Sequence, residues 1–88
     1  MNEKDLLKIL KALANKRRVE ILRFLKKRKT ASVGNIANTI KLSFTSTSKH
    51  LNILYIAGII EREQRSLQIF YRLSIDLPTT ISRLITTF

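Results

Sequence analysis

Residues 36–58 have the sequence IANTIKLSFTSTSKHLNILYIAG, and the expected fold class follows from their hydrophobic pattern. Its apolar residues recur at helical spacing on both sides of the tripeptide Lys41-Leu42-Ser43, which predicts helices over residues 33–40 and 44–57. Three residues are well placed to cap or end these helices: Ser32, Ser43 and Gly58. Two helices joined by so short a turn are typical of a helix-turn-helix motif.

Two amphipathic segments precede this motif. Leucines at positions 6, 7, 10 and 13 recur at helical spacing with lysines on the other side, which predicts a helix over residues 4–14. Asn15 can end this helix and cap the next one, which is expected over residues 16–27. The cations at the end of that second helix complement the helix dipole.

After Gly58 the hydrophobic period changes from helical to alternating. Residues 59–64 and 69–74 alternate around a polar turn, which predicts a two-stranded hairpin. The final segment, residues 76–88, begins with an Asp and a Pro in positions that a helix start favours. The fold class is therefore mainly α with a small β-hairpin, in the order α-α-α-α-β-β-α. A helix-turn-helix followed by a hairpin is a winged helix-turn-helix, and residues 1–88 are expected to form a single domain of this kind.

The charge of the chain indicates its partners. The 88 residues contain 17 Lys and Arg against 6 Asp and Glu, a net charge of +11, and this excess favours an anionic partner such as nucleic acid. Residues 1–29 alone have a net charge of +8, from eleven basic and three acidic residues. The run Lys26-Lys27-Arg28-Lys29 is compatible with two interpretations, a phosphate contact and a solvated loop.

The composition argues against several other classes of protein. The chain has no Cys and a single His, so metal and redox sites are not expected and no cofactor is predicted. It has no Ser-His-Asp set and no Gly-rich phosphate loop, which argues against an enzyme. Its apolar runs are too short to cross a membrane and its acidic start is unlike a signal peptide, so we expect a cytoplasmic protein without a membrane partner.

Four pieces of the sequence resemble the ArsR/SmtB-type winged-helix repressors. The sequence LKALANKRRVEIL at residues 10–22 looks like the opening of that family, and residues 36–54 look like its helix-turn-helix. The short sequences GII at 58–60 and IFYRL at 69–73 are similar to its two wing strands. The resemblance implies a homodimer that reads an inverted repeat in double-stranded DNA, with its terminal helices packed against their symmetry mates.

The chain departs from this family at the metal-ligand positions. Where metal-sensing members have a Cys pair at the start of the third helix, this chain has Ser32 and Gly34. Where others have Asp and His ligands on the C-terminal helix, this chain has Asp76 and no His. The resemblance therefore does not carry metal sensing over to this protein.

The apolar residues of the two terminal helices, about 4–14 and 77–88, are the expected dimer interface. A domain of this size would have difficulty covering both apolar stripes alone, although ordinary packing within one chain is the other interpretation. The residues expected at the interface are Leu6, Leu10, Leu13, Ile81, Leu84, Ile85 and Phe88.

The expected DNA-binding surface is the helix at 44–57 together with the wing at 59–74. If Thr47, Leu51 and Leu54 face the core, small polar side chains and a lysine face outward. Hydroxyl groups and lysine can contact phosphates or base edges when such a helix enters the major groove. The candidate DNA-binding residues are Phe44, Thr45, Ser46, Ser48, Lys49, His50, Arg62 and Arg65.

Three of these candidates have a second interpretation. Phe44 could contact a thymine methyl group or brace the turn against Leu42. His50 could contact phosphate or pack beside the core. Arg65 is the best candidate for a contact to the flanking minor groove or backbone, but it could also lie in a solvated loop.

The sequence thus predicts a homodimeric, sequence-specific DNA-binding transcriptional regulator that does not sense metal, with repression as the default direction of control. Two alternatives belong to other classes: a weakly specific architectural nucleic-acid-binding protein and a winged-helix protein-interaction module. An architectural protein would show a steep salt dependence with little preference between sequences.

Overall fold

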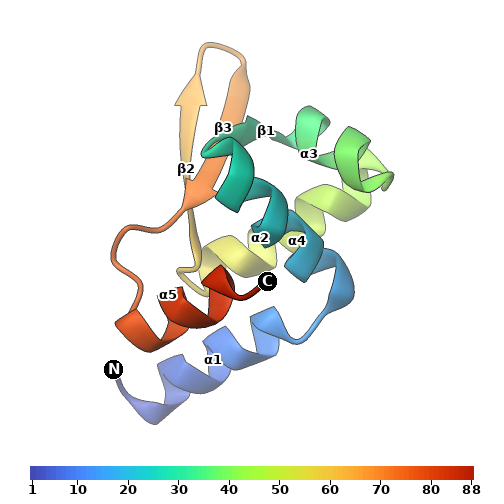
Figure 1. The fold of residues 1–88 in the computed structure, drawn as a ribbon. Helices are drawn as coiled ribbons and strands as arrows, with labels where there is room; N and C mark the ends of the chain where they lie inside the picture. The colour runs from blue at the N-terminus through green and yellow to red at the C-terminus, as the bar shows by residue number, and fades with distance from the viewer.

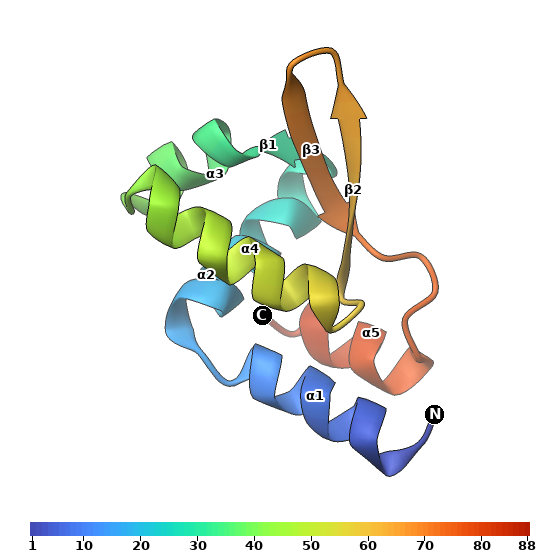
Figure 2. The same ribbon diagram turned by 180° about the vertical axis from the view of Figure 1, so that it is seen from behind.

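The computed structural model describes residues 1–88 and contains five α-helices and a three-stranded antiparallel sheet. The elements in chain order are α1 (Glu3–Leu13), α2 (Lys16–Arg28), β1 (Ala31–Ser32), α3 (Val33–Ile40), α4 (Phe44–Ile56), β2 (Ile60–Arg65), β3 (Gln68–Leu73) and α5 (Thr79–Thr86). The wing formed by β2 and β3 extends away from the helices, and α1 and α5 lie at the opposite end of the molecule (Figures 1 and 2).

Helix α2 lies at the centre of the fold and packs against α3, α4, β3 and α5. Its buried side chains Ile21 and Leu25 belong to one hydrophobic cluster with Leu51 and Leu54 of α4. The predicted buried stripe of α4 is confirmed, because Thr47, Leu51 and Leu54 are all fully buried. The opposite side of α4 is therefore left for solvent or a partner.

The caps predicted for the helices are confirmed. The Asn15 side chain accepts a hydrogen bond from the backbone N–H of Arg18 at 3.1 Å, and Ser32 and Ser43 cap α3 and α4 in the same way. Gly58 follows α4 with φ of +78°, a conformation that favours glycine. The bounds of α1 to α4 consequently lie within one residue of the predicted ones.

The last helix is shorter than the sequence predicts. Helix α5 begins at Thr79 rather than near Asp76, because Pro78 has an extended conformation with ψ of 143° and so cannot belong to the helix. Asp76 therefore lies before the helix and makes no capping hydrogen bond. At the other end, Phe88 lies beyond the last turn but packs against the core.

A third strand adds to the predicted hairpin. Ala31 pairs with Tyr71 and Ser32 pairs with Phe70, which gives the strand order β1-β3-β2. A strand of two residues is too short to show an alternating pattern, so the sequence gives no signal for it. Because Ser32 also caps α3, β1 connects the start of the helix-turn-helix directly to the wing.

Thr47 is a buried residue of α4 whose hydroxyl has no hydrogen-bond partner. Its side chain is 0% exposed, and its Oγ1 has no hydrogen-bond partner. A buried hydroxyl without a partner destabilises a fold, whereas valine has nearly the same shape and no polar group. We expect Thr47→Val to raise the free energy of unfolding by about 1 kcal/mol, which corresponds to a rise in Tm of about 4–8 °C in a domain of this size.

Thermal unfolding followed by circular dichroism measures this effect. Thr45→Val is the matched control, because it is the same substitution in the same helix at an exposed position. This variant should leave Tm nearly unchanged. A Thr47→Val variant that melts below the wild type would show that the hydroxyl has a stabilising partner.

Candidate nucleic-acid interface

An arginine of α2 contacts the end of α3, where the turn into α4 begins. Arg17 donates a hydrogen bond to the carbonyl of Ile40 at 2.8 Å and forms an ion pair with Glu20 at 3.1 Å. This contact caps the C-terminal end of α3, where unpaired carbonyls attract a cation. Lys41 then adopts a left-handed conformation, with φ of +57°, which ends α3 and directs the chain into α4. The Arg17 contact and the left-handed conformation of Lys41 together determine how α4 follows α3.

The first two turns of α4 present an unpaired polar surface. Phe44, Thr45 and Lys49 are exposed, and Ser46 and Ser48 are half-buried. The side chains of Thr45, Ser48 and Lys49 form no hydrogen bond or ion pair within the chain, whereas those of several other polar residues do. Donors and acceptors are therefore available at the N-terminal half of a rigidly packed helix.

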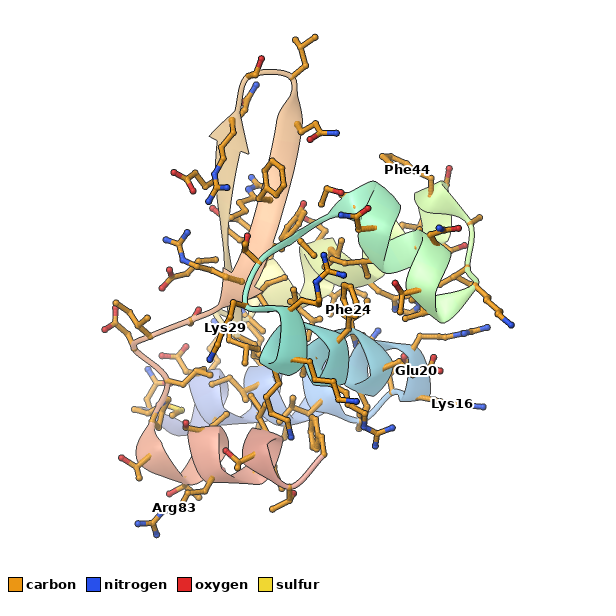
Figure 3. All side chains as sticks on the ribbon, turned by 45° about the horizontal axis from the view of Figure 1, so that its top comes forward. Lys16, Glu20, Phe24, Lys29, Phe44 and Arg83 are labelled. Carbon is orange, nitrogen blue, oxygen red and sulfur yellow. The ribbon has the colours of Figure 1, made fainter.

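Phe44 does not brace the turn as a buried residue. Its side chain is 62% exposed, while Leu42 packs against the core without it. Figure 3 shows Phe44 at the same end of the molecule as the wing, with Arg83 of α5 at the opposite end. The exposure of Phe44 favours the interpretation in which its ring contacts a partner.

His50 contacts an arginine that connects α1 to α4. Arg18 Nη1 lies 3.2 Å from His50 Nδ1, and Arg18 Nε donates to the carbonyl of Ala12 at 2.6 Å, near the end of α1. Burial, and then the positive charges of Arg18 and Arg17, lower the pKa of His50 below its ordinary value. Because arginine can only donate, Nδ1 is the acceptor and Nε2 carries the proton. His50 thus packs against Arg18 and keeps one N–H group for a further contact.

The two candidate arginines of the wing both contact other side chains, Arg62 on helix α4 and Arg65 within the wing. The Arg62 guanidinium lies over the ring of Tyr55 at 3.9 Å. The Arg65 guanidinium lies over the ring of Phe70 at 4.8 Å and forms an ion pair with Glu63 at 3.0 Å. Arg65 is therefore neither a freely solvated side chain nor the tip of the wing. Exposed ion pairs of this kind contribute little stability and can exchange for a phosphate.

The tip of the wing presents a leucine that sequence analysis did not select. A two-residue turn, Ser66-Leu67, joins β2 to β3, and Ser66 has φ of +57°. Leu67 is 96% exposed, the largest value among the exposed large apolar side chains. It borders a hollow of about 360 Å³ whose lining also includes Phe44 and Ile69, so the tip and the start of α4 face the same space. An apolar residue in a turn of polar neighbours is the only sequence signal for this feature.

The predicted dimer residues on and beside the terminal helices differ in their exposure to solvent. Leu6, Leu10 and Leu84 are exposed, as is the neighbouring Leu7, which the sequence analysis did not assign. Three others are buried within one chain, Leu13, Ile81 and Ile85, and Phe88 is half-buried against the core. The exposed leucines are therefore the most accessible to a second protomer, and the assignment of these residues to an interface stays a prediction.

The basic run at the end of α2 is not a solvated loop, because its first three residues form the last turn of the helix. Lys26 Nζ donates to the carbonyl of Thr86 at 2.8 Å and so caps α5. The Arg28 guanidinium lies 5.6 Å from the centroid of the Phe24 ring. Lys26 is therefore engaged in holding the C-terminal helix, whereas Lys27 and Lys29 are exposed.

No three His, Cys, Asp or Glu side chains lie close enough together to hold a metal ion. At the start of α3, Ser32 uses its hydroxyl to cap the helix, and Gly34 has no side chain. None of the helices has the length and apolar character needed to span a bilayer.

A helix-turn-helix whose second helix is anchored on one side and open on the other, followed by a two-stranded wing, defines a winged helix-turn-helix protein. The profile described as bacterial regulatory protein, arsR family, matches residues 15–62, more than half of the chain. The protein belongs to the ArsR family.

Several relatives support this assignment. The transcriptional activator HlyU of Vibrio cholerae is 36% identical over 66 residues, which make up 75% of this chain and 60% of HlyU. The chain therefore spans less than two thirds of the length of that relative in the match. The structure of reduced HlyU from Vibrio cholerae superposes with a TM-score of 0.82 at 31% identity, covering 98% of this chain and 86% of HlyU.

Two further solved structures share the fold. A Mycobacterium bovis fragment, described as a homodimeric winged helix-turn-helix DNA-binding domain, has a TM-score of 0.82 at 27% identity, covering 96% of this chain and 74% of the fragment. The transcriptional repressor PagR of Bacillus anthracis has a TM-score of 0.80 at 25% identity, covering 96% of this chain and 92% of PagR.

Proposed function

We propose that this protein is a homodimeric, sequence-specific DNA-binding transcriptional regulator of the cytoplasm. The observation that carries the proposal is the first half of α4, where Thr45, Ser48 and Lys49 are unpaired while the opposite side of the helix is fully buried. A helix held in this way can enter the major groove without rearranging, and its small hydroxyl residues allow close approach to base edges. The relatives described as transcriptional regulators support the same activity.

The electrostatics favour the same partner. A net charge of +11 on 88 residues gives a strong attraction to phosphates, which raises both the association rate and the affinity. Lys49 lies on the exposed side of α4, and the proposed contacts of Arg62 and Arg65 require only that exposed ring and ion-pair contacts exchange for phosphate.

The proposed dimer uses the terminal helices. Leu6, Leu10 and Leu84 are exposed apolar side chains at the end of the molecule opposite the wing, so a second copy can cover them without blocking α4. Two recognition helices related by a two-fold axis would read an inverted repeat whose half-sites lie about 34 Å apart. The Mycobacterium bovis fragment, described as homodimeric, is a precedent for self-association of this fold.

The protein would control transcription by occupying DNA. A dimer bound over a promoter excludes polymerase, so repression is the proposed direction of control, although HlyU is described as an activator. The proposed regulator does not sense metal, because the positions at the start of α3 and on α5 offer no thiolate or imidazole ligand.

Selection of duplexes from a random library at physiological salt tests the proposal. We expect recovery of an inverted repeat with half-sites about one helical turn apart. Binding without any enriched sequence would contradict the proposal and favour an architectural nucleic-acid-binding protein, which the charge of the chain would then explain.

Replacing Lys49 by Ala tests the role of α4. We expect weaker binding to the selected duplex and a decrease of about one unit per protomer in the slope of log affinity against log salt concentration, because one phosphate contact is lost. Fluorescence anisotropy at several salt concentrations measures both quantities. Lys4→Ala removes the same charge from α1, at the opposite end of the molecule, and should change the slope much less. Equal effects of the two variants would remove Lys49 from the interface.

A further inference from the structure

We infer that Leu67 is an apolar contact of the wing with the minor groove beside each half-site, and that it makes the protein prefer A·T base pairs there. This inference rests on the proposed function, since it assigns a residue to the same DNA complex. It concerns a side chain that neither the charge of the protein nor the helix-turn-helix explains.

The wing is poorly equipped for a purely electrostatic contact. Residues 59–74 contain three arginines and two glutamates, so their net charge is only +1 in a chain whose net charge is +11. Each of the three arginines is engaged: Arg62 lies over Tyr55, Arg65 is paired with Glu63, and Arg72 is paired with Glu61. Arg62 therefore contacts α4, Arg65 and Arg72 contact glutamates of β2, and no cation occupies the two-residue turn.

The turn itself offers an apolar side chain on a fixed backbone. Ser66 and Leu67 connect paired strands in which Arg65 is opposite Gln68, so the register holds the turn in place. Leu67 is 96% exposed and cannot contribute to the core. Its side chain borders the same hollow as Phe44, which places it on the side of the molecule that α4 presents to DNA. When α4 occupies the major groove, a wing on that side reaches the adjacent minor groove.

A leucine in the minor groove is expected to prefer A·T over G·C base pairs. Proteins that bind this groove commonly insert apolar side chains, leucine among them, while amides read its hydrogen-bond acceptors. Gln68 follows Leu67 directly and is exposed, so an amide stands beside the apolar side chain; the amide of the exposed Gln64 instead donates to the carbonyl of Ser66 at 3.4 Å. A G·C pair adds the guanine 2-amino group to the floor of the groove, whereas an A·T pair has only acceptors. The amino group would meet the leucine, so G·C pairs should be disfavoured under the tip.

Duplexes with altered flanks test this inference. The selected operator is prepared with each flanking base pair changed in turn from A·T to G·C, and also to inosine·C, which lacks the 2-amino group. For the wild-type dimer, G·C at the position under the tip should weaken binding by about fivefold or more, as a mismatched pair typically does. Inosine·C should restore the affinity. Leu67→Ser should bind the G·C, inosine·C and A·T flanks with nearly equal affinity.

The matched control is Ile75→Ser, which removes another highly exposed apolar side chain, 84% exposed, from the loop before α5. It should keep the wild-type discrimination between flanks. If Leu67→Ser discriminates as strongly as the wild type, or if inosine·C is as unfavourable as G·C, the inference is overturned while the proposed function stands. If the wild type selects no operator at all, the proposed function fails and the inference fails with it.

Discussion

Replacing Leu84 by Glu should convert the proposed dimer into a monomer and lower the affinity for the proposed inverted-repeat operator by about 10²- to 10⁴-fold. Leu84 is 42% exposed and lies on α5 next to Ile85, which is already buried within one chain. In a two-fold interface a glutamate at this position would place one carboxylate from each protomer in an apolar contact, which opposes association. A monomer retains one recognition helix and loses the benefit of binding two half-sites at once.

Sedimentation velocity and anisotropy with the selected duplex measure the two effects. Ile75→Glu is the matched control, because it places the same charge at an exposed apolar side chain outside the terminal helices. It should remain a dimer and bind the operator with nearly the affinity of the wild type. Circular dichroism should show that both variants are folded, since neither residue belongs to the buried core. A Leu84→Glu variant that still sediments as a dimer would exclude α5 from the interface.

The helices could be predicted from sequence because their signals are local. Asn15, Ser32 and Ser43 each accept a backbone hydrogen bond from three residues further along, so the residues that start each helix are adjacent to it in sequence. Strand β1 could not be predicted, because it exists only through its pairing with β3, some 40 residues away along the chain. The start of α5 could not be placed either, because it depends on the extended conformation that Pro78 adopts in the folded chain.

The candidate interface was predictable where it follows from the periodicity of α4. Once Thr47 and Leu51 are buried, the exposed positions of the same helix are determined by geometry. The positions of the wing arginines could not be predicted, because they depend on neighbours on other elements: Arg65 contacts Phe70 on the other strand, and Arg62 contacts Tyr55 on α4. The exposure of the turn residue Leu67 likewise depends on the register of the two strands.

The exposure of the predicted dimer residues could not be predicted from helical periodicity either. A helical pattern distinguishes the apolar side of a helix from its polar side, but not the part covered by its own chain from the part left to a partner. On α5 both Ile81 and Leu84 belong to the apolar side, yet only Leu84 is exposed. That division is set by packing against α2, including the Lys26 contact to the carbonyl of Thr86.

Replacing Leu51 by Ala should produce the largest loss of stability among the changes considered for α4. Leu51 is 0% exposed and belongs to the cluster that joins α4 to α2. Truncating a fully buried leucine typically costs about 2–5 kcal/mol, because the contacts of the removed atoms are lost and a cavity is left. A domain of this size has a total stability of roughly 5–10 kcal/mol, so a substantial unfolded fraction is expected at elevated temperature.

Thermal melts with and without operator separate the effect on the fold from the effect on the interface. Leu51→Ala should lower Tm by about 10 °C or more, and saturating operator should restore part of that loss, because DNA binds only the folded protein. Ile53→Ala is the matched control, since it truncates a large aliphatic side chain of the same helix that is exposed. The variant Ile53→Ala should melt close to the wild type. Equal destabilisation by the two changes would mean that α4 is not anchored through its Leu51 side, and the outward orientation of Thr45, Ser48 and Lys49 would then lose its structural basis.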